Sequence, residues 1–247
     1  MKLKGLGFLL VMLTLTACQP AATTEPGTAT ATLSPTSTST STPQPSAIPP
    51  TATGTPLPAV RVFKDDFSQD SPYWSFLQVD AGQSSARPEV KSGFLLFDLP
   101  APNQWLYALY EPFAYTDVRL DADVQVRGGP QGTPGLVCRY DNERGWYEFD
   151  IHEDQTYVLL YGQWLADGVA RYTPLVRAGS EKILPSENEM GLLCEGDTLT
   201  PYINGTQLRR QQEKTFALTS GKIGVAASAF EDGPVVIAYD WMQAALP

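Results

Sequence analysis

The sequence predicts an all-β protein built as an antiparallel β-sandwich. Apolar and polar residues alternate with a period of two in many short segments, a pattern typical of strands with one face on a core. Turn-forming residues separate these segments, and no segment sustains the period of a helix. Many short strands at this spacing favour a sandwich.

The chain begins with an expected lipoprotein signal peptide, residues 1–17. Lys2 and Lys4 precede an apolar stretch over residues 5–13, which is too short for a permanent transmembrane helix. The letters LTAC, ending at Cys18, resemble the lipobox of bacterial lipoproteins, in which cleavage before the cysteine leaves a lipidated N-terminus. We therefore expect a lipidated Cys18; the alternative is an ordinary secreted protein with a cysteine near its cleavage site.

Residues 18–58 are expected to form a disordered linker. They are rich in Thr, Ser, Pro and Ala, with Glu25 as their charged residue and few large apolar side chains. Such a segment cannot bury enough surface to offset the entropy of ordering. We expect a spacer without a partner of its own, which holds the domain outside the cytoplasm, anchored by acyl chains to the bacterial cell membrane.

Residues 59–247 are expected to fold as one domain, because their length suits a single sizeable core. The chain carries a net charge of −10. Without a basic patch it is not expected to bind nucleic acid, and an acidic surface is repelled by anionic lipid. We expect a monomer that touches the membrane only through its lipid anchor.

The segment DVRLDADVQV, residues 117–126, shows the alternation most clearly. Its apolar residues fall on one face, and the other face carries Arg119, Asp121, Asp123 and Gln125. Similar strands are expected at residues 94–99, 104–110, 135–140, 146–152, 156–162, 222–228 and 235–242. Asn204-Gly205 supplies the positive φ angles of a type I′ hairpin turn.

Cys138 and Cys194 are the two cysteines of the domain, and they lie in the similar strands GLVC and GLLC. Outside the cytoplasm such a pair most often forms a disulfide. We expect a bridge between neighbouring or stacked strands; the alternative is two buried free thiols.

Four segments together carry a family resemblance: DDFS near the start of the domain, GLVCRYDNERGWYEFDI, LLCEGDTLTPYING and SGKIGVAASAFEDGPVVIAYDW. They resemble the concanavalin A-like lectin/glucanase superfamily, and more narrowly the laminin-G-like or 3-keto-disaccharide-hydrolase-like domains of stalked bacterial surface proteins. The resemblance covers nearly the whole domain and implies a jelly roll. Because these motifs mark the positions of strands and hairpins, the resemblance implies a fold and does not imply a chemical activity.

The letters EFDIHE, residues 148–153, match the Glu-x-Asp-x-x-Glu spelling found in some jelly-roll glucanases. Retaining glycoside hydrolases use two carboxylates about 5 Å apart. In a strand, Glu148 and Asp150 share a face, but Glu153 has the opposite parity unless a bulge intervenes. Glu153 also reads as part of a hairpin tip, where a carboxylate stays solvated. We therefore do not expect an enzyme, and hydrolysis by Glu148 and Glu153 is the alternative.

Sugar binding requires aromatic rings that stack on the sugar and polar groups that orient its hydroxyls. The candidate rings are Trp105, Tyr107, Trp146, Tyr161 and Trp164. The candidate polar partners are Asp123, Gln125, Arg139, Glu148 and Asp150. Two other interpretations stay open: Trp105 and Tyr107 can be core residues, and Arg139 can form a cross-strand ion pair. The leading hypothesis is a non-catalytic module for an extracellular carbohydrate; a purely structural or protein-interaction domain is a further alternative.

No cofactor is expected, except that Asp65, Asp66 and Asp240 offer oxygen ligands for a structural calcium ion if the terminal strands pair. Aspartates near a strand start also commonly cap turns. The single histidine, His152, has no nucleophile motif nearby and is expected to be a surface residue.

Overall fold

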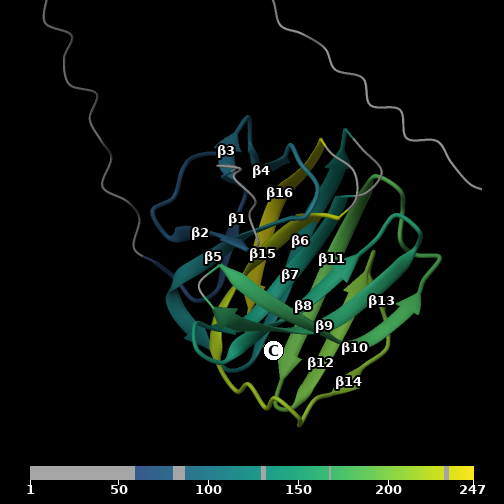
Figure 1. The fold of residues 1–247 in the computed structure, drawn as a ribbon. Coiled ribbons are helices and arrows are strands. Elements are labelled where there is room, and N and C mark those ends of the chain that lie inside the picture. The colour runs from purple at the N-terminus through teal and green to yellow at the C-terminus, as the bar shows by residue number, and fades with distance from the viewer. Residues whose placement is uncertain (1–58, 80–86, 129–131, 167, 231–233) are drawn as a thin grey trace, which may run out of the picture. The chain divides into compact units, whose positions relative to one another are not determined.

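The computed structural model describes residues 59–79, 87–128, 132–166, 168–230 and 234–247. Within these ranges the chain forms strands and turns and contains no helix (Figure 1). The described residues therefore include no helix long and apolar enough to cross a membrane. The expected signal peptide, Cys18 and linker lie outside the described residues.

The strands form two antiparallel sheets, which confirms the predicted all-β sandwich (Figure 1). Sheet A has the order β13 (Thr206–Gln207), β12 (Thr198–Ile203), β11 (Glu187–Glu195), β6 (Val118–Arg127), β16 (Val235–Ala245), β4 (Phe94–Leu99) and β3 (Glu89–Lys91). Beside this path, β1 (Phe63–Asp65) pairs with β16, and β14 (Gln211–Gln212) pairs with β12. Sheet B has the order β10 (Val169–Gly179), β9 (Thr156–Ala166), β8 (Gly145–Ile151), β7 (Gly132–Asp141), β15 (Gly221–Ala229), β5 (Gln104–Tyr115) and β2 (Trp74–Val79).

Between the sheets lies the main core, formed by the apolar face of each strand. In β6 the buried residues are those that the alternation predicted, Val118, Leu120, Ala122 and Val124. They pack in one cluster with residues of sheet B such as Phe149 and Leu159. The period of two therefore decides which face of β6 the core covers.

Strands β7 and β8 depart from the expected alternation, because both of their faces are buried. A second apolar cluster covers the face of sheet B that is turned away from sheet A, here called the outer face. Its buried members are Val79, Tyr107, Leu109, Val137, Tyr140, Trp146 and Ala226. Sheet B is thus covered on both sides, whereas the sequence predicted a polar outer face.

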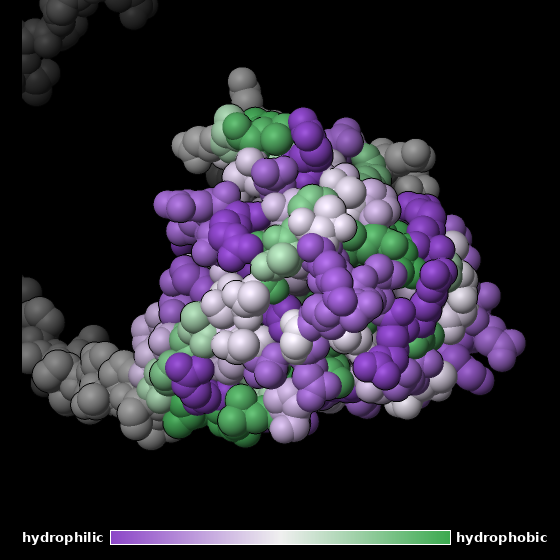
Figure 2. Space-filling model, turned by 90° about the horizontal axis from the view of Figure 1, so that it is seen from below, coloured by the Kyte–Doolittle hydropathy of each residue, from purple (hydrophilic) through white to green (hydrophobic). Residues whose placement is uncertain are grey.

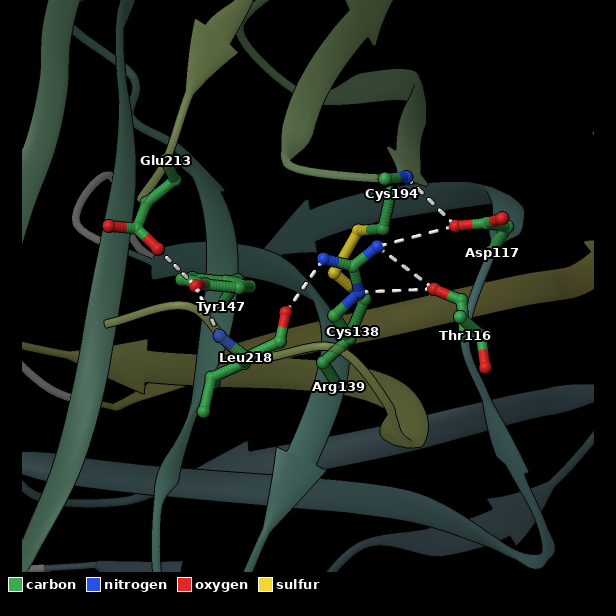
Figure 3. Close-up of a disulfide and its surroundings, with 9 residues drawn as sticks. Thr116, Asp117, Cys138, Arg139, Tyr147, Cys194, Glu213 and Leu218 are labelled. Carbon is green, nitrogen blue, oxygen red and sulfur yellow. Dashed lines mark hydrogen bonds and ion pairs between the residues drawn. A yellow bond between two sulfur atoms is a disulfide. The ribbon is translucent and has the colours of Figure 1, made fainter. Parts of the chain in front are cut away.

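Two local predictions are confirmed in sheet A and between the sheets. Asn204 and Gly205 have φ angles of 48° and 74° and join the paired residues Ile203 and Thr206, as expected of a two-residue hairpin turn. Cys138 on β7 and Cys194 on β11 form a disulfide that links the two sheets (Figure 3).

Apolar side chains on the surface are scattered. Seen from the side that Figure 2 shows, polar residues predominate and apolar residues form small separated patches. Among the described residues, Leu165 and Val169 are exposed near the turn between β9 and β10, and Phe230 is exposed just after β15. Single exposed apolar residues of this kind are normal for a folded domain.

Candidate functional site

The outer face of sheet B brings together six of the candidate residues: Trp105, Tyr107, Trp146, Glu148, Asp150 and Trp164. Trp146, Glu148 and Asp150 alternate along β8 and point to this face, as their parity predicted. Trp164 on β9 lies beside them, with its ring centroid 5.3 Å from that of Trp146. The period of two in the sequence therefore placed the three β8 residues on one face, as the structure has them.

Glu148 and Asp150 form a buried carboxyl pair, with only 3% and 5% of each residue exposed. The Oε2 atom of Glu148 accepts hydrogen bonds from Trp146 Nε1 at 2.8 Å and from the Tyr107 hydroxyl at 3.0 Å. Gly135 lies opposite Asp150 in β7, and a Cβ atom there would stand 2.4 Å from Asp150 Oδ1. The glycine thus makes room for the pair, a role that its place in GLVC did not reveal.

Burial shifts the protonation of both carboxyls toward the neutral form. Burial raises the pKa of both groups, and the negative charge of Glu148 raises the pKa of Asp150 further. Hydrogen bonds from Trp146, Asp150 and Tyr107 favour the ionised form of Glu148. Of the two groups, Asp150 is therefore the one whose pKa is raised further.

This pair makes stability depend on pH in a direction that can be tested. The pKa of Asp150 is raised in the folded protein, so folding takes up a proton above the ordinary value of 3.8, and stability falls as pH rises toward the raised pKa. Asp150→Asn keeps a hydrogen-bond donor without a titrating group. At about pH 8 we expect the free energy of unfolding of this variant to exceed that of wild type by on the order of 1 kcal/mol, and its melting temperature to be higher. This difference should vanish at about pH 4.

Thermal unfolding across that pH range measures the effect, and Glu153→Gln is the matched control because Glu153 is exposed. An Asp150→Asn variant whose melting temperature tracks wild type at every pH would contradict the raised pKa of Asp150.

On the outer face, aromatic rings from strands on either side of β8 gather around the carboxyl pair. Tyr172 on β10 stacks on Trp105 on β5, with centroids 6.0 Å apart and an interplanar angle of 24°. Phe230, which is 39% exposed, packs against Trp105 in a T-shaped arrangement, with ring centroids 5.4 Å apart. Trp105, Tyr172 and Trp164 are each partly exposed, so they form the accessible rim of this face. Tyr172 and Phe230 were not recognised as candidates in the sequence.

The structure corrects the placement of Asp123 and Gln125. Both point outward from β6, as their parity predicted, but β6 belongs to sheet A. They pair with Glu189 and Glu187 of β11, on the opposite side of the sandwich from Glu148. Alternation shows that a side chain faces water, but it cannot show which sheet the strand joins.

Arg139 and Tyr161 are also placed elsewhere. Arg139 is 2% exposed, and Figure 3 shows its guanidinium beside the disulfide, where it donates to the backbone oxygens of Thr116 and Leu218. Its φ of 54° accompanies a register shift in the β7–β8 pairing, so simple parity fails there. Tyr161 points into the main core and stacks on Phe216, with centroids 3.6 Å apart.

Glu153 lies in the exposed turn between β8 and β9. The β8–β9 register runs from Trp146 to Ile151 without a shift, so no bulge within β8 turns Glu153 toward Glu148. His152 is partly buried instead of fully exposed: its Nδ1 lies 3.1 Å from Thr133 Oγ1, and burial followed by the charge of Arg177 lowers its pKa.

The terminal strands pair as expected, β1 with β16, near the three aspartates considered for calcium. Asp65 accepts hydrogen bonds from the Phe67 amide at 2.9 Å and from Trp74 Nε1 at 2.8 Å. Asp66 accepts one from the Ser68 amide at 3.1 Å. In the part of the chain that the structure describes, no three or more His, Cys, Asp or Glu side chains are grouped to hold a metal ion.

Comparison with known proteins places the fold. No family model and no curated protein sequence matches the chain. Among solved structures, the chain is similar to a Bacillus licheniformis β-glucanase, with a TM-score of 0.51 and 12% identity over 77% of this chain and 100% of that one. It is similar to a Bacillus subtilis protein of unknown function with a galectin-like fold, with a TM-score of 0.56 and 12% identity over 74% and 94%.

A glycoside hydrolase family 16 endo-glucanase from Bacteroides ovatus also matches, with a TM-score of 0.53 and 10% identity over 74% of this chain and 99% of that one. At such identities the likeness concerns the fold alone. The domain therefore has the antiparallel sandwich fold of these jelly-roll proteins, which is the fold that the sequence resemblance implied.

Proposed function

We propose that this domain binds an extracellular glycan on the outer face of sheet B and does not cleave it. The observation that carries the proposal is the pair of partly exposed tryptophans, Trp105 and Trp164, which pack against the aromatic cluster of this face. Aromatic faces stack on the apolar C–H surface of sugars, and a few fixed polar groups then orient the hydroxyls. The likeness to glucanases supports a glycan as the ligand class at the level of the fold.

The proposal excludes hydrolysis for two reasons. A retaining glycosidase needs two carboxyls about 5–5.5 Å apart that both reach the scissile bond. Glu148 is covered by aromatic rings and already accepts two hydrogen bonds, while Glu153 lies in the turn beyond β8. Glu148 serves instead to fix the orientation of Tyr107 and Trp146 beneath the rim.

We further propose that Cys18 anchors the chain outside the bacterial cytoplasm and that residues 18–58 hold the domain away from the membrane. The lipobox-like letters LTAC and the Thr/Ser/Pro-rich composition support this arrangement. Metabolic labelling with a fatty acid tests it: label that persists in Cys18→Ser would overturn the anchor.

The glycan proposal is tested by binding to a glycan array and to insoluble polysaccharides. Trp164→Ala is expected to weaken binding about tenfold, which corresponds to about 1.4 kcal/mol. Trp241→Ala is the matched control, since Trp241 is a partly exposed tryptophan of sheet A that lies against Lys64. Wild type that binds no glycan, or equal losses in both variants, would count against this face. Release of reducing sugar from β-glucans would instead establish the hydrolase alternative.

A further inference from the structure

Tyr172 makes two contacts on the outer face that a bound sugar unit would make. Its ring lies nearly parallel to the Trp105 indole, at 6.0 Å and 24°. Its hydroxyl lies 3.0 Å from the hydroxyl of Tyr107. Because Tyr107 donates its own proton to Glu148, the Tyr172 hydroxyl is the donor in this pair. A single side chain thus combines ring stacking with a directed hydroxyl contact.

These contacts connect two strands that lie far apart in the strand order of sheet B. Strands β9, β8, β7 and β15 separate β10 from β5. In a flat sheet β10 and β5 would be about 24 Å apart, so the sheet curls to bring the two rings together. The bridge covers Tyr107 and Trp146, which are fully buried, and it occupies the stacking position on Trp105.

The strand that carries Tyr172 is built to shift more easily than its neighbours. Among the described strands, β10 pairs with β9 alone, so it is an edge strand. Its register with β9 shifts on both sides of Tyr172, between Val169 and Ala170 and between Pro174 and Val176. An edge segment bounded by such irregularities opens with less loss of structure than a central strand.

We infer that Tyr172 is an internal occupant of a sugar-stacking subsite formed by Trp105 and Tyr107, and that a glycan must displace it to bind there. The inference rests on the proposed function and adds to it the chemistry of the subsite. The subsite takes one sugar ring whose apolar face lies on Trp105 and whose hydroxyl donates to Tyr107, in place of the Tyr172 hydroxyl. Displacement leaves Glu148 with its hydrogen bonds from Tyr107 and Trp146.

Tyr172→Ala removes the occupant and tests the inference on the same glycan array. In wild type the apparent affinity is the intrinsic affinity multiplied by the fraction of molecules in which the subsite is open. We therefore expect Tyr172→Ala to reach half-saturation at about tenfold lower protein concentration than wild type. Tyr172→Phe keeps the ring but loses the hydroxyl contact, and its affinity is expected to lie between the two. Adding Trp105→Ala to Tyr172→Ala should abolish the gain. Arg171→Ala, a change at the exposed neighbour on β10, is the control and should bind as wild type does.

The outcomes separate the two proposals. If wild type binds, Trp164→Ala weakens it and Tyr172→Ala binds equally or more weakly, the internal occupant is refuted while glycan binding on this face stands. If no variant binds any glycan, the proposed function falls and the subsite falls with it. Should Tyr172→Ala lose its cooperative thermal transition, Tyr172→Phe decides, because binding no tighter than wild type would refute the inference.

Discussion

Replacing Cys138 by alanine is expected to lower the free energy of unfolding by about 4 kcal/mol and the melting temperature by about 10 °C. The disulfide joins residues 56 positions apart in sequence and links sheet B to sheet A. Without the disulfide, the unfolded chain is no longer closed into a long loop and gains conformational entropy. Both cysteines are fully buried in the folded protein. Thermal unfolding of the oxidised protein measures the loss.

The double variant is the control for this prediction. Cys138→Ala and Cys194→Ala each remove the same bond, so they should be similarly destabilised and the double variant no worse than either. Losses that add up in the double variant would mean that the two side chains stabilise the protein separately. Mass spectrometry that finds two alkylatable thiols in the natively purified protein would contradict the bond itself.

Gly162→Ala is expected to lower the free energy of unfolding by about 3 kcal/mol. Gly162 on β9 lies opposite Trp146, and a Cβ atom there would stand 2.3 Å from the indole ring. The indole cannot move aside, because Tyr107, Tyr140 and Trp164 pack around it. The variant should also disturb the hydrogen bond from Trp146 to Glu148, so tryptophan fluorescence should change with stability.

Gly179→Ala is the matched control in the same sheet. A Cβ atom at Gly179 has Gln155 O as its nearest neighbour at 3.6 Å, an ordinary contact. This variant is expected to stay within about 0.5 kcal/mol of wild type. Equal melting temperatures for the two glycine variants would show that the outer-face cluster is loosely packed.

The sequence predicted the features that depend on local pattern. A period of two places Glu148 and Asp150 on one face of β8 whatever the rest of the chain does. Asn204-Gly205 specifies its turn because few other residue pairs adopt two positive φ angles. The disulfide followed from the number of cysteines and their similar strands.

What the sequence could not predict depends on contacts between distant segments. Tyr107 and Tyr172 are 65 residues apart, and only the curl of sheet B brings their hydroxyls together. Asp123 has the expected orientation within its strand, but the pattern of β6 does not reveal which sheet that strand joins. Arg139 escapes the parity rule because a left-handed residue at a register shift redirects its side chain.

The burial of β8 on both faces has a consequence for the exchange of its amide hydrogens with solvent. All of its residues, Gly145 to Ile151, are buried, and β7 and β9 flank it in the sheet. Edge segments can exchange by local fraying, but a strand enclosed in this way exposes its amides only when the sandwich opens as a whole. The carboxyl groups of Glu148 and Asp150 lie in the same enclosure, so water reaches them through motions of the covering rings and not through fraying of their own strand.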